Sequence, residues 1–210
     1  MSRREYKEKE VETLPAGYQR LEYIQTNYNL MQYIDTGIYG VTESWRFEFD
    51  VEPYDRNYHC GLHGTLGRGG SERIATLIVM NSTLNGRIDY VCGGTGYKSS
   101  DAYAPANQRH NIIVSKDQIV VDGVSHAKQY RTYQIDDYSL ILMAFEYRDG
   151  DNTKTCSSGK WFGIKVFDNE GNQRLDLVPA LRLSDSKPGM YDSINSQFFT
   201  NSGSGEFSYA

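Results

Sequence analysis

The stretch Trp45-Arg46-Phe47-Glu48-Phe49-Asp50-Val51 alternates without a break between apolar and charged side chains. Large apolar residues occupy the odd-numbered positions, and charged residues occupy the even-numbered ones. A period of two residues is typical of a β-strand that turns one face to a core and the other to solvent. The stretch therefore predicts a half-buried strand and suggests that the surrounding chain is built from strands as well.

Short apolar segments of similar length follow along the chain, separated by Gly, Asn and Asp turn signals. The further strand candidates are residues 74–80, 87–92, 110–115, 118–121, 139–147, 161–167 and 173–179. Asp122-Gly123 and residues 168–172 predict tight hairpin turns, because Asp, Asn and Gly tolerate the positive φ of such turns. No segment keeps a 3.6-residue period over three turns. We therefore expect an all-β jelly-roll sandwich of two antiparallel sheets with little helix.

The composition supports a folded core and disfavours two classes of partner. Hydrophobic residues make up 39% of the 210 residues, and charged residues make up 23%. The net charge of -5, without a basic stripe, argues against nucleic acid, since phosphate binding requires clustered Lys and Arg. We see no signal-peptide segment and no apolar run long enough for a bilayer, so we expect synthesis in the host cytoplasm and no membrane insertion. Three Cys at irregular spacing fit reduced, structural thiols better than a disulfide framework.

The chain divides into an arm and one domain. Residues 1–13 are rich in charge and lack apolar periodicity, so they are expected to form a charged N-terminal arm that orders against a partner. No linker or internal repeat divides the remainder. Residues 14–210 are therefore predicted to form a single β-sandwich, a size that such domains commonly reach.

Two regions of the sequence carry a resemblance to a known family. Near the start are LPAGYQRLEYI (residues 14–24) and QYIDTG (32–37); near the end are GIKVFD (163–168), LVPA (177–180), GMYD (189–192) and FFTNSGSGEF (198–207). These motifs resemble the opening and the close of a concanavalin A-like (laminin G-like) jelly-roll domain. That domain occurs in bacteriophage virion and tail proteins and in gut-bacterial surface proteins.

The resemblance implies a non-enzymatic role at the surface of a phage virion, in a tail, fibre or capsid-surface protein. The expected partners are a host-surface glycan or a neighbouring virion structural protein, within a homo- or hetero-oligomeric assembly. The family supplies no catalytic set that can be carried over residue by residue. The middle of the chain, about residues 56–160, is where binding specificity is expected to vary.

An alternative interpretation is a glycoside hydrolase of the jelly-roll glucanase type. Glu48, Asp50 and Glu52 point to one face of the predicted strand, as nucleophile, helper and acid do in glucanases of this fold. A retaining mechanism needs two carboxyl groups ~5 Å apart. Glu48 and Glu52 are separated by ~13 Å of strand rise unless the strand bulges. Since a solvent-facing side of any strand collects charges, we expect no enzymatic activity.

An acidic segment, Asp149-Gly150-Asp151-Asn152, suggests a metal site. Oxygen ligands at alternating positions suit Ca²⁺, and laminin G-like domains often hold Ca²⁺ at the rim of the sandwich. The segment lacks the ligand spacing of an EF-hand, so an acidic turn is the simpler interpretation. The candidate ligands are Asp149, Asp151 and Asn152, and no other cofactor is expected.

Tyrosines in and beside the predicted loops are the candidate ligand contacts. They are Tyr54, Tyr58, Tyr97, Tyr103, Tyr130 and Tyr133, with Tyr138 close by. Loops on a rigid sandwich are where binding residues concentrate, and a Tyr ring suits either a sugar or a protein interface. Besides glycan binding and hydrolysis, a purely structural role in virion decoration or assembly stays open.

Overall fold

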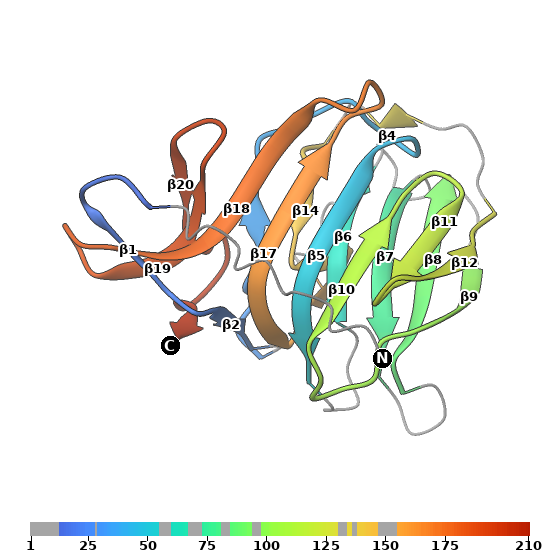
Figure 1. The fold of residues 1–210 in the computed structure, drawn as a ribbon, viewed down its shortest axis with the longest axis horizontal. Coiled ribbons are helices and arrows are strands. Elements are labelled where there is room, and N and C mark those ends of the chain that lie inside the picture. The colour runs from blue at the N-terminus through green and yellow to red at the C-terminus, as the bar shows by residue number, and fades with distance from the viewer. Residues whose placement is uncertain are drawn as a thin grey trace, which may run out of the picture.

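The computed structural model describes residues 13–27, 29–54, 60–66, 73–80, 85–93, 98–129, 134–135, 138–146 and 155–210. Within these residues the chain forms strands β1 to β21 and no helix. The described residues therefore contain no apolar helix long enough to cross a bilayer. The strands form two main antiparallel sheets (Figure 1). The predicted all-β jelly-roll sandwich is therefore confirmed.

The larger sheet has eleven strands. Its main path runs β12 (Val124–Ala127), β11 (Gln118–Val121), β10 (His110–Val114), β5 (Arg46–Pro53), β17 (Gly159–Phe167), β18 (Gln173–Arg182), β19 (Lys187–Asp192) and β20 (Gln197–Phe199). Off this path, β1 (Tyr18–Arg20) pairs with β18, and β2 (Ile24–Thr26) pairs with both β17 and β21 (Ser208–Tyr209). The first and last described strands therefore belong to the same sheet.

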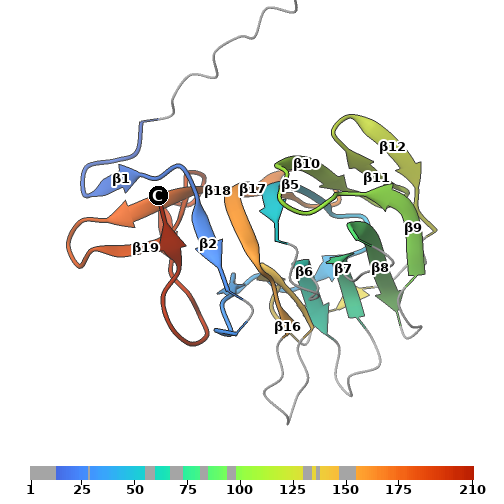
Figure 2. The same ribbon diagram turned by 90° about the horizontal axis from the view of Figure 1, so that it is seen from below.

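The second main sheet has six strands. Its order is β3 (Ile34–Asp35), β14 (Ile141–Leu142), β6 (Cys60–Leu66), β7 (Arg73–Val79), β8 (Arg87–Gly93) and β9 (Lys98–Tyr103). Two small pairs complete the fold: β13 (Gln134–Ile135) with β4 (Val41–Thr42), and β15 (Ala144–Glu146) with β16 (Thr155–Cys156). Figure 2 shows β6, β7 and β8 in a layer facing β5, β10 and β17.

The core lies between these layers, and β5 shows how the sequence builds it. Phe47, Phe49 and Val51 are at most 2% exposed, whereas the charged residues between them lie on the outer face. The alternation of apolar and charged residues in the sequence thus matches the alternation of buried and outward-facing side chains in β5. Trp161 of β17 is fully buried in the same core, and its indole Nε1 donates a 3.0 Å hydrogen bond to Thr26 Oγ1.

A small wing extends from one side of the sandwich, at the left of Figure 1. We use "wing" for β1, β19, β20 and the C-terminal half of β18. The wing has an apolar cluster of its own, in which Tyr18 packs on Tyr191 and Phe198 with ring centroids 4.8 and 5.3 Å apart. Because β18 pairs with β17 through one half and with β1 through the other, one continuous strand joins the wing to the sandwich.

Candidate functional site

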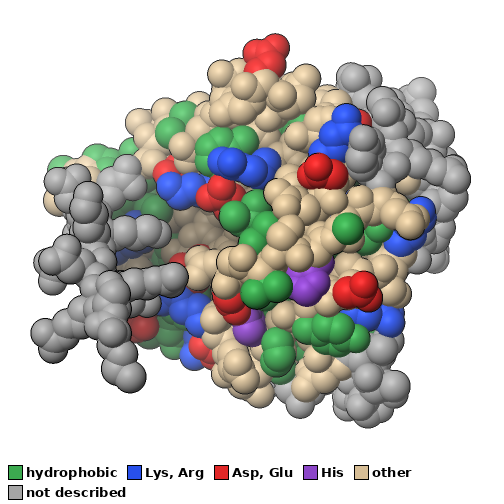
Figure 3. All heavy atoms as spheres, turned by 45° about the vertical axis from the view of Figure 1, so that its right-hand side comes forward, with side chains coloured by type: hydrophobic (Ala, Val, Ile, Leu, Met, Phe, Trp, Pro, Cys, Tyr) green, Lys and Arg blue, Asp and Glu red, His purple; other side chains and the backbone are tan. Residues whose placement is uncertain are grey.

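A groove of about 1180 Å³ lies on the outer face of the eleven-stranded sheet. Its floor is formed by β5, β10, β17 and β18, and residues 20–22, at the end of β1 and just after it, line one side. The polar lining residues are Thr13, Arg20, Glu22, Glu48, Asp50, Arg109, Asn111, Lys165 and Asp176. Figure 3 shows this face hollowed, with acidic and basic side chains gathered around the opening.

A β-bulge in β17 turns an aromatic ring toward this groove. Trp161 lies opposite Val51 and Gly163 lies opposite Asp50, so Phe162 is the extra residue between two paired positions. Trp161 and Ile164 both point into the core and are at most 1% exposed. A bulge redirects the side chain of the inserted residue, and here Phe162 lines the groove instead of the core.

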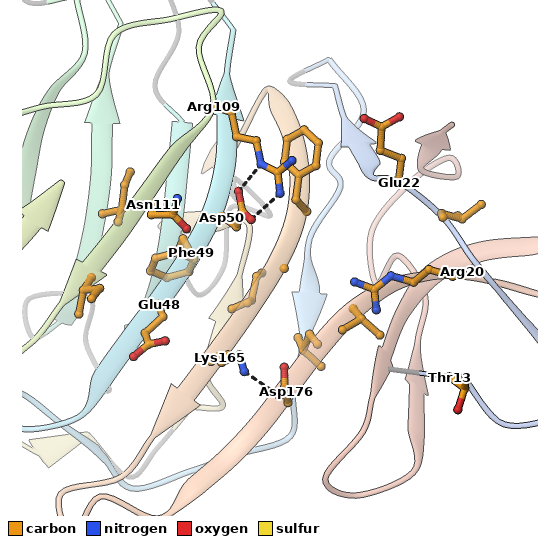
Figure 4. A pocket seen from close by; sticks show the side chains of 18 residues that line it. Thr13, Arg20, Glu22, Glu48, Phe49, Asp50, Arg109, Asn111, Lys165 and Asp176 are labelled. Carbon is orange, nitrogen blue, oxygen red and sulfur yellow. Dashed lines mark hydrogen bonds and ion pairs between the residues drawn. The ribbon is translucent and has the colours of Figure 1, made fainter. Parts of the chain in front are cut away.

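Phe162 supports a fixed arginine. The Arg109 guanidinium carbon lies 3.8 Å from the centre of the Phe162 ring. Arg109 Nε and Nη2 donate hydrogen bonds of 2.7 Å each to the two carboxylate oxygens of Asp50 (Figure 4). The hydrogen bond to Asp50 is also the main cause that raises the pKa of Arg109 above its usual value. A bidentate ion pair stacked on a ring holds the guanidinium in position and orientation.

Two further ion pairs order the outer face of the sheet. Lys165 Nζ lies 3.0 Å from an oxygen of Asp176, its direct neighbour across the β17–β18 ladder. Glu48 lies 3.0 Å from Arg46, two residues earlier on the same side of β5. Asn111 of β10 lies opposite Asp50 and adds an amide to the lining. The groove therefore presents hydrogen-bonding groups that are anchored to neighbouring strands.

The three carboxylates of the hydrolase alternative share the outer face of β5, but only two of them line the groove. Glu48 and Asp50 are lining residues, whereas Glu52 is not among them. Glu52 accepts a 2.9 Å hydrogen bond from Lys160, on the adjacent strand. Each of the three carboxylates thus has a cationic partner within 3.0 Å. Their carboxylate oxygens are therefore engaged by neighbouring side chains of the sheet.

Of the predicted tyrosine contacts, the three that the structure describes do not line the groove. The Tyr54 hydroxyl donates a 3.0 Å hydrogen bond to Gln25 Oε1, and the side chain is half-buried. Tyr103 is 49% exposed on β9 of the six-stranded sheet, away from the groove lining. Tyr138 is half-buried. Tyr58, Tyr97, Tyr130 and Tyr133 lie outside the described residues.

The predicted Ca²⁺ ligands Asp149, Asp151 and Asn152 also lie outside the described residues. Across the described part of the chain, no group of three or more His, Cys, Asp or Glu side chains is placed to hold a metal ion. The Ca²⁺ site therefore stays a prediction from the sequence.

Among the groove residues that the sequence did not single out are Arg20, Arg109, Phe162, Lys165 and Asp176. One signal for Phe162 was available, because Trp161 and Phe162 are consecutive large aromatics that interrupt the alternation of the strand. Arg109, just before β10, lies on no predicted strand. Its partner Asp50 is 59 residues away in sequence.

Comparison with solved structures agrees with the fold. The native heptameric SAP-like pentraxin from Limulus polyphemus superimposes with a TM-score of 0.52 at 11% identity, covering 71% of this chain and 75% of the pentraxin. A protein from Bacteroides ovatus ATCC 8483, provisionally described as carbohydrate-binding, also gives a TM-score of 0.52 at 11% identity. That match covers 91% of this chain and spans 60% of the Bacteroides protein. No protein-family model and no curated protein matches the sequence.

Identities this low establish a shared fold and nothing finer. The chain is an all-β protein with a jelly-roll sandwich fold, which is the fold that the resemblance read from its two ends implies.

Proposed function

We propose that this protein binds carbohydrate in the groove on the outer face of the eleven-stranded sheet, without chemical turnover. The observation that carries the proposal is the cluster of Phe162, Arg109 and Asp50, which fixes a hydrogen-bonding plane inside a groove of about 1180 Å³. The description of the Bacteroides protein as carbohydrate-binding adds support at the level of the fold class.

The arrangement suits a polyhydroxyl ligand for a physical reason. A sugar hydroxyl donates one hydrogen bond and accepts others, so it needs donors and acceptors side by side. Carboxylates supply acceptors, and guanidinium, ammonium and amide groups supply donors, all held on paired strands. Because these side chains are already ordered by their ion pairs, ligand binding costs less side-chain entropy.

We extend the proposal to the setting that the sequence resemblance implies, the surface of a phage virion. There the groove would hold a host-surface glycan, with residues 1–13 attaching the domain to its assembly. The experiment that tests this setting is co-purification of the protein with intact virions of a phage that encodes it. Its presence in purified particles and its loss when residues 1–13 are deleted are the expected results.

A glycoside hydrolase is the second candidate, because Glu48 and Asp50 do line the groove. It predicts release of reducing ends from β-glucans, abolished by Glu48→Gln. We expect instead that the wild-type protein releases none above background. Glu48→Gln would then change the affinity for the glycan, and the rate of reducing-end release would stay at background.

A purely structural assembly protein is the third candidate. It predicts tight association with a virion subunit that is lost on deletion of residues 1–13, together with no affinity for any glycan. Tyr103, which is 49% exposed on β9, lies outside the groove lining and offers a marker for a protein contact on the other sheet. In that case Tyr103→Ser, and not a groove substitution, would weaken association with the subunit.

The decisive experiment is a glycan-array measurement on the full chain, repeated with Ca²⁺ and with EDTA. Phe162→Leu should reduce binding to the selected glycans, since the support beneath Arg109 is lost. The matched control is Phe198→Leu in the wing, where Arg182 lies over the ring with its guanidinium carbon 5.0 Å from the ring centre. Binding that persists in Phe162→Leu and is lost in Phe198→Leu would place the site elsewhere. Loss of binding in EDTA would implicate Asp149, Asp151 and Asn152.

A further inference from the structure

We propose that the groove selects uncharged glycans and discriminates against anionic ones, because five of its seven charged lining side chains are ion-paired within the protein before any ligand arrives. This inference rests on the proposed carbohydrate-binding function and names the class of ligand that the same groove takes.

The lining is rich in charge but close to balance. It contains four carboxylates and three cations. The carboxylates are Glu22, Glu48, Asp50 and Asp176, and the cations are Arg20, Arg109 and Lys165. A groove built for a sulfated or carboxylated polymer requires a surplus of Lys and Arg that attracts the ligand over a distance. The described lining residues show no such surplus, so an anionic chain gains no net attraction from them.

The charges are compensated within individual ion pairs as well as over the lining as a whole. Asp50 is bonded to Arg109 at 2.7 Å, and Asp176 lies 3.0 Å from Lys165. An anionic ligand that forms an ion pair with Arg109 or Lys165 must first displace the carboxylate of Asp50 or Asp176 from that cation. The displaced carboxylate remains in the groove, next to the bound ligand. The displaced carboxylate then faces a second negative charge, which is a repulsive element acting against anionic ligands.

These ion pairs leave hydrogen-bonding capacity unused. Arg109 donates hydrogen bonds to Asp50 through Nε and Nη2, and its Nη1 makes no hydrogen bond with the described residues. Its side chain is 51% exposed, although the ring of Phe162 lies beneath it. Lys165 carries three N–H donors, of which the contact with Asp176 engages one. Neutral hydroxyls fit these remaining donors and acceptors without disturbing the charge balance.

The wing contains a second cluster of the same chemistry, which provides the control. Arg182 Nε and Nη2 donate hydrogen bonds of 3.0 and 2.7 Å to the two oxygens of Asp185. Its guanidinium lies over the Phe198 ring, and neither Arg182 nor Asp185 lines the groove. The same substitution can therefore be made in an arginine–aspartate–phenylalanine cluster inside the groove and in one outside it.

The first measurement compares ligand classes on the full chain by isothermal titration. The probes are neutral hexasaccharides of glucose, galactose, mannose and N-acetylglucosamine, beside oligogalacturonate and a chondroitin sulfate hexasaccharide. We expect a neutral probe to bind at least about tenfold more tightly than either anionic one. We also expect its Kd to change less than about twofold between about 50 and about 300 mM salt, since compensated charges make little use of long-range attraction.

The second measurement uncouples the charges. The double variant Asp50→Asn/Asp176→Asn keeps side-chain size but leaves Arg109 and Lys165 without their carboxylates. It should gain affinity for the anionic probes by about tenfold, and the gain should shrink as salt is added. Asp185→Asn, the control, should leave both ligand classes unchanged. Arg109→Lys should weaken neutral binding while Arg182→Lys does not, because Lys keeps the charge but loses the bidentate geometry.

The outcomes distinguish failure of the proposed selectivity for neutral glycans from failure of the proposed carbohydrate binding. Binding of no glycan of either class overturns the proposed function, and the inference falls with it. Preferential binding of the sulfated or uronic probes by the wild-type protein overturns the inference and leaves carbohydrate binding standing. A double variant that gains no anionic affinity, although it is folded and binds neutral probes, also overturns the inference.

Discussion

The imidazole of His63 lies parallel to the phenyl ring of Phe47 in the core, with ring centroids 3.9 Å apart and 10° between the planes. His63 is 1% exposed, and neither of its ring nitrogens has a hydrogen-bond partner among the described residues. Burial, with a smaller contribution from the positive charge of Lys128, lowers the pKa of His63 from 6.5 to about 3. The folded protein therefore holds this imidazole neutral at pH values where an unfolded chain would protonate it.

Acid should destabilise the protein partly through His63. Between pH 6.5 and about 3 the unfolded state takes up a proton at His63 that the folded state does not, so the free energy of unfolding falls as the pH falls. His63→Phe should remove this dependence, by up to about 1.4 kcal/mol per pH unit. Denaturant unfolding from pH 7 to pH 4 checks it, with His126→Gln on β12 as control. Equal slopes for wild type and His63→Phe would contradict the prediction.

Asp192 is a second residue on which stability should depend. It is fully buried, and its oxygens accept hydrogen bonds from the backbone N–H groups of Asp176 and Ile194 and from Asn195 Nδ2, at 2.6 to 3.1 Å. Asp192→Ala should lower the free energy of unfolding by about 3 kcal/mol, because three buried or half-buried donors lose their acceptor. Asp185→Ala, on the surface of the same hairpin, should have little effect in the same urea titration. Similar losses for the two variants would refute this role of Asp192.

Gly189 should tolerate no side chain. A Cβ at this position would collide with the carbonyl oxygen of Phe199 and with the ring of Phe198, on the neighbouring strand β20. Gly189→Ala should therefore force β19 and β20 apart and lower the free energy of unfolding by about 3 kcal/mol. In Gly163→Ala the added carbon would lie 3.7 Å from the Leu177 carbonyl oxygen, an ordinary contact. Thermal unfolding should consequently separate the two variants clearly, and a Gly189→Ala protein as stable as wild type would show that β20 moves freely.

The thiol of Cys60 should be unreactive in the native protein. It is 1% exposed, and burial raises its pKa to about 12, against the weaker opposing effect of hydrogen bonds with Ser157 and Ser158. Since the thiolate is the reactive form, iodoacetamide at pH 8 should label Cys60 only after denaturation. Mass spectrometry of the peptide that carries Cys60 gives the rate. If iodoacetamide labelled Cys60 in the native protein as fast as it labels free glutathione, this part of β6 would have to open readily.

The sandwich could be predicted from the sequence, because its signals are local. The alternation in residues 45–51 corresponds to β5, and Asp122-Gly123 forms the predicted turn between β11 and β12, with φ of 50° and 86°. Each of these features depends on neighbours within a few residues. Period and turn chemistry are therefore sufficient to find them.

The groove could not be predicted, because it depends on register. Whether Phe162 points inward or outward is decided by a one-residue shift between β17 and β5, which no period in the sequence reveals. The contact between Arg109 and Asp50 likewise requires the pairing of β5 with β10. Tyrosines near turns were visible in the sequence, but the described ones, Tyr54, Tyr103 and Tyr138, do not line the groove.

The position of β2, between β17 and β21, has a consequence for how the protein is made. The hydrogen bond between Trp161 and Thr26 spans 135 residues, and β1 finds its partner in β18. During synthesis β1 and β2 therefore emerge long before β17 and β18, and they lack these partners until those strands have been made. Such non-local pairing is slow and leaves strand edges open to other nascent chains. The pairing of β1 and β2 with the sheet is therefore expected to be completed late in the folding of this domain.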